Sequence, residues 1–191
     1  MAYLIDPRKN WQLAEERLAG ETDPRRRQIL ETLVAHAKAE AAADFPALMD
    51  TVSPEAHYQS YAAGDEAANE AQSPKGKDGV AAYYTAIVES GCHFIEHATE
   101  RMAVGRDTLT TEGELKMAYP GAVLAAMGVE VPDPGSLYLY TQRLLIVWEF
   151  DEDGLVLCED SYSGGGPGFE GIASRPVRPE QIYQVGPADG N

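Results

Sequence analysis

The sequence predicts an α+β fold in which a strongly curved antiparallel sheet wraps around a long helix and forms a cone. Three observations predict it. Helical periodicity is confined to the first half of the chain, before Gly91. Long alternating strands follow, and tight turns join them as hairpins, which makes the sheet antiparallel. A sheet curved around a helix leaves a pocket between the two, where we expect any functional site.

Length and composition limit the class of protein. The 191 residues suggest one domain with additions at its ends: an N-terminal arm (1–22), a cone domain (23–163) and a Gly/Pro-rich, irregular tail (164–191). The formal net charge is −16, from 15 Lys and Arg against 31 Asp and Glu, which argues against nucleic acid and anionic membranes as partners. No apolar run reaches membrane-spanning length, and charges interrupt the N-terminal segment. We expect a cytoplasmic protein with two reduced cysteines.

Helix signals divide the first half of the chain. In "TDPRRRQIL" Asp23 caps a long helix and Pro24 occupies its first turn, and in "DFPALMD" Asp44 caps a short one. A third helix, "KDGVAAYYTAIVESG", ends at Gly91. The arm around Trp11 predicts a short helix that docks on the body or on a second subunit.

Strand signals occupy most of the remainder. "EAHYQSY" (55–61) predicts a strand, and the polar segment 62–79 that follows predicts a lid or a disordered flap. "HFIEHATERMAV" and "TLTTEGELKMAY" predict a hairpin around "VGRD". "PGAVLAAMGVEVPDPGS" predicts an insert with a helical lid. The strand 137–150 then pairs with "LVLCEDSYS" across "DEDG". Leu, Val and Trp on strand 137–150 predict an outer face that forms a homodimer.

Two histidines share one face of the first hairpin strand. His93 and His97 are four residues apart, which places them about 13 Å apart on a strand. Zinc–nitrogen bonds are only about 2 Å long, so the two are too far apart to share one ion directly unless a bulge intervenes. No phosphate-binding loop, Cys-x-x-Cys or facial metal triad occurs in the sequence. We therefore expect no metal and no cofactor.

Four stretches together resemble a known superfamily. They are "ALMDTVSPEAHY", "KGKDGVAAYYTAI", "HFIEHATERMAVGRDTLTTEG" and "IVWEFDEDGLVLCEDSY", and the similarity covers about residues 24–163. They resemble the nuclear transport factor 2-like superfamily in its SnoaL-like branch, whose cystatin-like α+β barrel is the cone predicted above. The resemblance implies a hydrophobic small-molecule ligand.

A sharper similarity concerns cofactor-free lyases of that superfamily. "CHFIEHATERMAVGRDTL" resembles the segment that carries the catalytic histidine of scytalone dehydratase-type enzymes, which makes His93 the implied general base. Tyr58 takes the place of a tyrosine that polarises a carbonyl through water, and a second histidine of that enzyme falls near Tyr119. The carboxylate that orients the base falls in "AEAAAD", where Glu40 or Asp44 could serve.

The candidate site follows from this resemblance and from strand geometry. His97 replaces His93 as the base if the register slips. The expected catalytic residues are His93, His97, Tyr58 and Asp44. The expected substrate-binding residues are Tyr84, Arg101, Glu112, Tyr119, Tyr140 and Asp160.

Three classes of function fit this site. The first is a cofactor-independent lyase, dehydratase-like or deformylating, that acts on a small hydrophobic, hydroxylated aromatic compound by His/Tyr acid–base catalysis. The second is an isomerase or polyketide-cyclase-like enzyme, and the third is a binding protein without chemistry. The lyase is favoured because "QSYAAG" holds no carboxylate where ketosteroid isomerases place their aspartate base.

Overall fold

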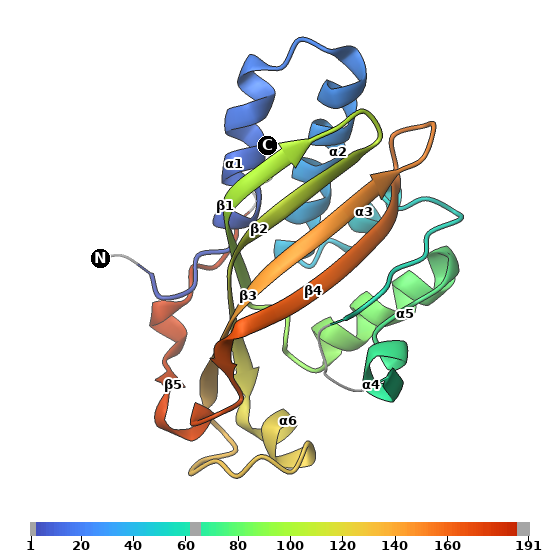
Figure 1. The fold of residues 1–191 in the computed structure, drawn as a ribbon. Helices are drawn as coiled ribbons and strands as arrows, with labels where there is room; N and C mark the ends of the chain where they lie inside the picture. Colours follow the sequence, from blue (N-terminus) through green and yellow to red (C-terminus); the bar gives the residue numbers. More distant parts are fainter. Residues whose placement is uncertain (1–2, 62–65, 187–191) are drawn as a thin grey trace.

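A computed structural model describes residues 3–61 and 66–186 and shows a curved antiparallel sheet (Figure 1). Four long strands pair in the order β1-β2-β3-β4, and a short fifth strand pairs with the start of β3. The strands are β1 Ile95–Val104, β2 Thr108–Pro120, β3 Leu137–Phe150, β4 Val156–Gly168 and β5 Pro176–Val177. The predicted fold class and both predicted hairpins are confirmed.

Helices α2, α3 and α5 lie on one side of the sheet (Figure 1). The α-helices are α1 Lys9–Gly20, α2 Pro24–Ala41, α3 Phe45–Asp50, α4 Glu66–Ala71, α5 Gly76–Glu89 and α6 Gly121–Ala126. Two 3-10 helices, η1 Ile172–Ser174 and η2 Pro179–Gln181, lie in the C-terminal segment. None of the helices in the described ranges is long and apolar enough to cross a bilayer.

The predicted helix boundaries have the expected local chemistry. The Asp23 carboxylate accepts hydrogen bonds from the amides of Arg25 and Arg26 at the start of α2, and Asp44 accepts one from Ala47 at the start of α3. Gly91 follows α5 with φ +73°, a left-handed conformation that favours glycine. These boundaries set the positions from which α2 and α5 cross the sheet.

The main core lies between the helices and the inner face of β2 and β3. Leu109 pairs with Trp148 and Thr111 pairs with Ile146, and all four side chains are buried. The Trp148 indole also donates a hydrogen bond to Thr111 Oγ1 at 3.0 Å. The expectation that Trp148 lies on the outer, dimer-forming face is therefore wrong, because Trp148 belongs to the core.

Segments near the two ends of the described chain pack together on the outer face of the sheet. Ile5 from the arm packs with Ala118, Val177 and Ile182, all buried. The fully buried Glu96 accepts a hydrogen bond from the Asp6 amide and pairs with Lys9 and Lys116, so the arm is tied to β1 and β2 of its own chain. Of the two placements expected for the arm, docking on the body is found. The homodimer stays a prediction, which sedimentation at micromolar concentration would test.

Residues 55–61 do not form the predicted strand. The segment runs beside β4 with only isolated bridges, such as Ser60 to Ser161. Its backbone bonds are divided, because the His57 amide bonds to Leu157 of β4 and the Tyr58 amide bonds to Pro74 before α5. The bridges are isolated and do not continue into a ladder on either side.

Two further segments differ from expectation. The predicted flap at 62–79 includes α4 and the start of α5, while residues 62–65 lie outside the described ranges. The tail predicted from residue 164 is not wholly irregular, because β4 continues to Gly168 and β5 pairs with β3. Ile172 and Val177 bury their side chains and hold this segment on the sheet.

Candidate active site

A row of hydrogen-bonded polar side chains, three of them buried and Glu159 half-buried, crosses the interior between the helices and β4. His36 of α2 lies at its centre, with Nδ1 at 2.8 Å from Thr51 Oγ1 and Nε2 at 3.0 Å from the Tyr84 hydroxyl. That hydroxyl is 2.9 Å from Glu159 Oε2 on β4. Four residues, from α2, the C-cap of α3, α5 and β4, are thus joined by hydrogen bonds.

The protons available on these side chains decide which group donates in each hydrogen bond. Thr51 donates its hydroxyl proton to the Leu48 carbonyl at 2.6 Å, so Thr51 accepts from the His36 Nδ1–H. Burial lowers the pKa of His36 to about 4, so the ring is neutral and Nε2 is an acceptor. Tyr84 has one proton for two possible acceptors. When Tyr84 donates to His36, Glu159 must be protonated and donate to Tyr84.

Two carboxyl groups in this region have strongly perturbed acidity. Burial raises the pKa of Glu40 to about 7. Burial, followed by the nearby charge of Glu40, raises the pKa of Glu159 to about 8. Two close carboxylates in a poorly solvated site cannot both ionise at low cost, so they share protons as a pair near neutral pH. One protonated and one ionised carboxyl are a general acid and a general base.

A small cavity connects these groups to a histidine. Glu40, Tyr84 and His93 provide its polar lining, and apolar side chains of α3 and α5 provide the rest. The cavity measures about 10 Å³, close to the space that one water molecule needs. Binding of an aromatic ring therefore requires side chains such as Phe45 and Val88 to move away.

His93 has one ring nitrogen available to a ligand. Its Nδ1 is buried, and no described residue forms a hydrogen bond with it. Burial lowers the pKa of His93, although the Val88 carbonyl partly opposes this. The ring is therefore neutral at pH 7, which is the state that a general base needs.

A second unsatisfied group, the Tyr58 hydroxyl, lies on the same side of the sheet. Tyr58 is 4% exposed and its hydroxyl has no hydrogen-bond partner among the described residues. Its ring packs edge-on against Tyr84 at 6.5 Å between centroids. Burial, followed by the charge of Glu159, raises the pKa of Tyr58, so the phenol stays protonated and can donate to a ligand. The neighbouring His57 is exposed, so only Tyr58 of the two points inward.

His93 and His97 lie in different surroundings in the structure. His93 precedes β1, which starts at Ile95, and lines the cavity. His97 is buried, and its Nε2 donates to the Leu144 carbonyl at 3.2 Å. Burial lowers the pKa of His97 to about 4. Its ring nitrogen is already engaged with the backbone, so His97 is placed as a core residue rather than beside the cavity.

Other predicted residues also lie away from the cavity. Asp44 is exposed and caps α3, so Glu40 is the member of "AEAAAD" that reaches the cavity. Arg101 pairs with Glu112 at 2.6 Å on the outer face, and Glu112 also pairs with Arg143. The expected roles of these residues are not supported by their positions, because their charges are already paired or directed to solvent.

The remaining predicted residues lie in three different places. Tyr84 is part of the hydrogen-bonded chain. Tyr119 and Tyr140 pack with Phe169, at 5.2 and 4.8 Å between ring centroids, in a separate aromatic cluster. Asp160 alternates with Glu159 along β4 and therefore points to the outer face.

Sequence reasoning missed His36 and Glu159, and it left Glu40 undecided. A signal was present in α2, where the buried positions Ile29 and Leu33 continue at helical spacing to His36 and then Glu40. Polar residues in an apolar stripe indicate a buried polar site. Glu159 pairs with the core residue Trp148 across the sheet, a relation that depends on strand register.

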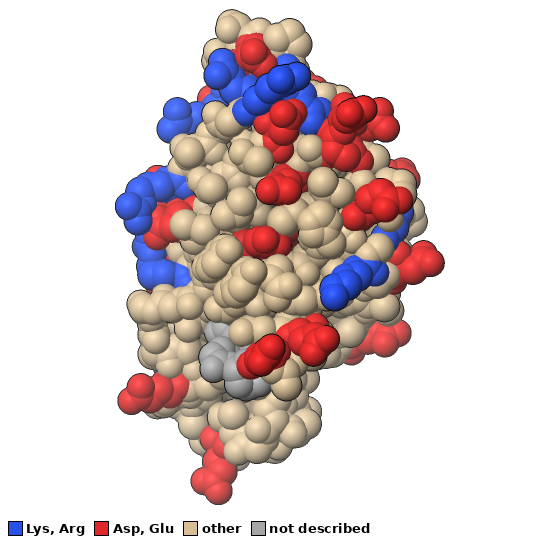
Figure 2. Space-filling view, turned by 45° about the vertical axis from the view of Figure 1, so that its right-hand side comes forward, with Lys and Arg blue, Asp and Glu red and all other residues tan. Residues whose placement is uncertain are grey.

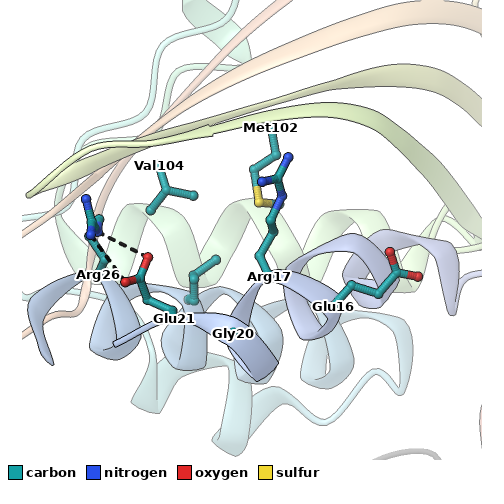
Figure 3. Close-up of a pocket in the computed structure, with 8 residues that line it drawn as sticks. Glu16, Arg17, Gly20, Glu21, Arg26, Met102 and Val104 are labelled. Atoms are coloured by element: carbon teal, nitrogen blue, oxygen red, sulfur yellow. Dashed lines mark hydrogen bonds and ion pairs between the residues drawn. The ribbon is translucent and has the colours of Figure 1, made fainter. Parts of the chain in front are cut away.

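A larger hollow lies elsewhere on the described surface. Figure 3 shows it between α1 and β1, where Arg17 lies beside Met102 and Arg26 pairs with Glu21. It measures about 470 Å³ and contains none of the groups with raised carboxyl pKa. We place the candidate site at the smaller cavity because the acid–base groups converge there. Figure 2 shows acidic side chains spread over the face that it displays, including its centre.

We expect thermal stability to fall as pH rises from about 6.5 to 8. Glu40 and Glu159 have raised pKa values in the folded protein, so the folded state binds more protons than the unfolded state in this range. Their contribution to stability is present below about pH 4.5 and is lost as pH rises through their folded pKa values. Melting temperatures across this range measure the effect, and a flat or rising curve contradicts the assignment.

Comparisons with known proteins give structural matches only. No protein-family model and no curated protein matches the sequence. A protein named as a SnoaL-like polyketide cyclase from Shewanella putrefaciens CN-32 matches with a TM-score of 0.58 at 13% identity, covering 85% of this chain and 91% of its own.

Two other structures were solved with ligands. A protein with a ketosteroid isomerase-like fold from Catenulispora acidiphila DSM 44928, in complex with trimethylamine, matches with a TM-score of 0.54 at 12% identity and coverage of 81% and 96%. TerC, crystallised with polyporic acid, matches with a TM-score of 0.51 at 11% identity and coverage of 72% and 92%. At these identities the similarity shows the fold alone.

Proposed function

We propose that this protein, which has a nuclear transport factor 2-like fold, is a cofactor-independent lyase. One observation carries the proposal. The hydrogen-bonded chain from Thr51 through His36 and Tyr84 to Glu159 borders a cavity that Glu40 and His93 also line. An acid, a base and a path for protons thus surround one small space.

The proposed reaction is the elimination of water from a hydroxylated ring compound. Neutral His93 removes a proton from carbon at Nδ1, and the electrons of that C–H bond form the double bond. The C–O bond breaks, and the leaving oxygen takes a proton from Tyr84, which Glu159 replaces through their hydrogen bond. Ionised Glu40 stabilises the protonated His93 across the cavity. Proton return from His93 to Glu159 restores the resting state.

The side chains around the cavity favour a hydrophobic, hydroxylated ligand. Phe45, Ile87 and Val88 provide apolar contact. The Tyr58 phenol does not line the cavity, but it packs against Tyr84, which does, and it offers a donor to a ligand that opens the space further. TerC, which was crystallised with polyporic acid, has a similar fold, and this supports a small-molecule ligand. The same groups would move a proton between two carbons in an isomerase, so the substrate panel must separate the two reactions.

A panel of bicyclic aromatic β-hydroxyketones tests the proposal, because loss of water extends conjugation and changes the absorbance. A steroid β,γ-enone is the matched isomerase substrate. We expect dehydration of at least one hydroxyketone, lost in His93→Ala and kept in Glu130→Gln, which alters an exposed carboxylate. Turnover of the enone alone favours isomerisation. Ligand binding without turnover of any compound contradicts both reactions and leaves a binding protein.

A further inference from the structure

Three potential metal ligands converge on the outer side of the sheet, away from the candidate active site. One donor atom each from His57, Glu149 and Cys158 lies within 4.8 Å of the other two. We propose that these residues form a zinc-type site. The sequence predicted no metal because these residues match no spacing motif; strand pairing brings them together.

The backbone fixes the relative position of the three residues. Glu149 and Cys158 are cross-strand partners in the β3–β4 ladder, so their side chains leave the sheet side by side on the same face. The His57 amide donates to the Leu157 carbonyl at 2.8 Å, which holds His57 next to Cys158. Each residue is therefore held by backbone bonds that do not depend on a metal.

The separations are close to those of a zinc site. Bonds of about 2.0–2.3 Å in tetrahedral geometry place neighbouring ligand atoms about 3.3–3.8 Å apart. The present separations of up to 4.8 Å require contraction by about 1 Å. His57 and Glu149 are exposed and can rotate, whereas Cys158 is buried and provides the fixed ligand.

The surroundings also match those of a metal-binding histidine. His57 Nδ1 lies 3.3 Å from the Glu55 carbonyl, which can only accept, so Nδ1 carries the proton and Nε2 keeps its lone pair. Asp160, which follows Cys158 on the same face of β4, has Oδ1 buried without a hydrogen-bond partner among the described residues. A neighbouring cation would satisfy this oxygen, directly or through water.

The donor set selects the class of metal. One imidazole, one thiolate and one carboxylate suit zinc and related borderline cations, whereas magnesium and calcium prefer oxygen ligands alone. Cys158 binds as thiolate and releases its proton to solvent when the ion enters. The bound ion links the segment at His57 to β3 and β4, and the adjacent Tyr58 points into the core. The site thereby fixes the segment that carries Tyr58, independently of any catalytic activity.

Cobalt substitution tests the proposal in the full-length protein. Chelator-treated protein titrated with Co²⁺ should bind one ion per chain and show a thiolate-to-cobalt charge-transfer band that Zn²⁺ abolishes. Cys158→Ser should remove the band, while Cys92→Ser, which changes the other buried cysteine, should keep it. His57→Ala should weaken Co²⁺ binding about tenfold or more. Zn²⁺ should also raise the melting temperature of the wild type.

His57→Ala keeps the test decisive if Cys158→Ser fails to fold, because His57 is exposed and its removal leaves the core intact. The proposal is overturned by the absence of saturable binding in the wild type. It is equally overturned by a charge-transfer band that persists in folded Cys158→Ser, or by His57→Ala binding Co²⁺ as tightly as the wild type does.

Discussion

Replacing Glu159 with glutamine should lower turnover by about 10²–10⁴-fold and should raise the melting temperature at pH 8. Glutamine has the same shape and can still donate to the Tyr84 hydroxyl, but it cannot supply a proton for transfer. It also cannot ionise, so the folded protein no longer bears the cost of charging a buried carboxyl above neutral pH. Activity and stability should therefore change in opposite directions.

Controls distinguish this result from general damage. Glu130→Gln alters an exposed carboxylate and should change neither turnover nor the melting temperature. Tyr84→Phe should lower turnover, and combining it with Glu159→Gln should add little, since both interrupt one hydrogen-bonded chain. Normal turnover in Glu159→Gln would exclude Glu159 as the proton source. Lower stability at pH 8 would contradict its raised pKa.

The opposite changes expected from Glu159→Gln follow from where the carboxyl group lies. A carboxylate beside Trp148 and Tyr84 is less well solvated than one at the surface, and this raises its pKa and reduces stability near neutral pH. The same perturbation keeps a proton available at pH 7. Perturbed acids of this kind mark functional sites more often than structural ones.

Local features of the fold could be predicted from the sequence. Which face of a strand packs against the core could not. Asp23, Asp44 and Gly91 act through bonds or conformations within a few residues, so their effects are visible in the sequence. In β3, both alternating faces are apolar, with Val147 on one and Trp148 on the other. Alternation alone cannot choose between them, and packing against α2 buries Trp148.

The candidate site shows the same division. Tyr58 and His93 were predicted from short stretches that resemble superfamily lyases, and the structure places Tyr58 against the buried Tyr84 and His93 on the cavity wall. Glu159 could not be found because its partner Tyr84 is 75 residues away. Their contact depends on the position at which α5 crosses β4, which is a property of tertiary packing.

Alanine substitutions should separate the roles of His93 and His97. His93→Ala should lower turnover by about 10²–10⁴-fold with little change in melting temperature, because His93 is only half-buried and its Nδ1 has no partner among the described residues. His97→Ala should leave turnover per folded molecule near normal. It should lower stability by about 1–3 kcal/mol, since the part-buried hydrogen bond to the Leu144 carbonyl is lost.

Stability measurements with a conservative variant complete this test. For a chain of this length, each kcal/mol of lost stability lowers the melting temperature by about 2–4 °C. His97→Gln keeps a side-chain N–H for the Leu144 carbonyl and should recover part of the lost melting temperature, whereas His93→Gln should not recover turnover, because an amide is not a base. If His97→Ala abolishes turnover in a folded protein while His93→Ala does not, the general base is His97 and the cavity at His93 is not the site of reaction.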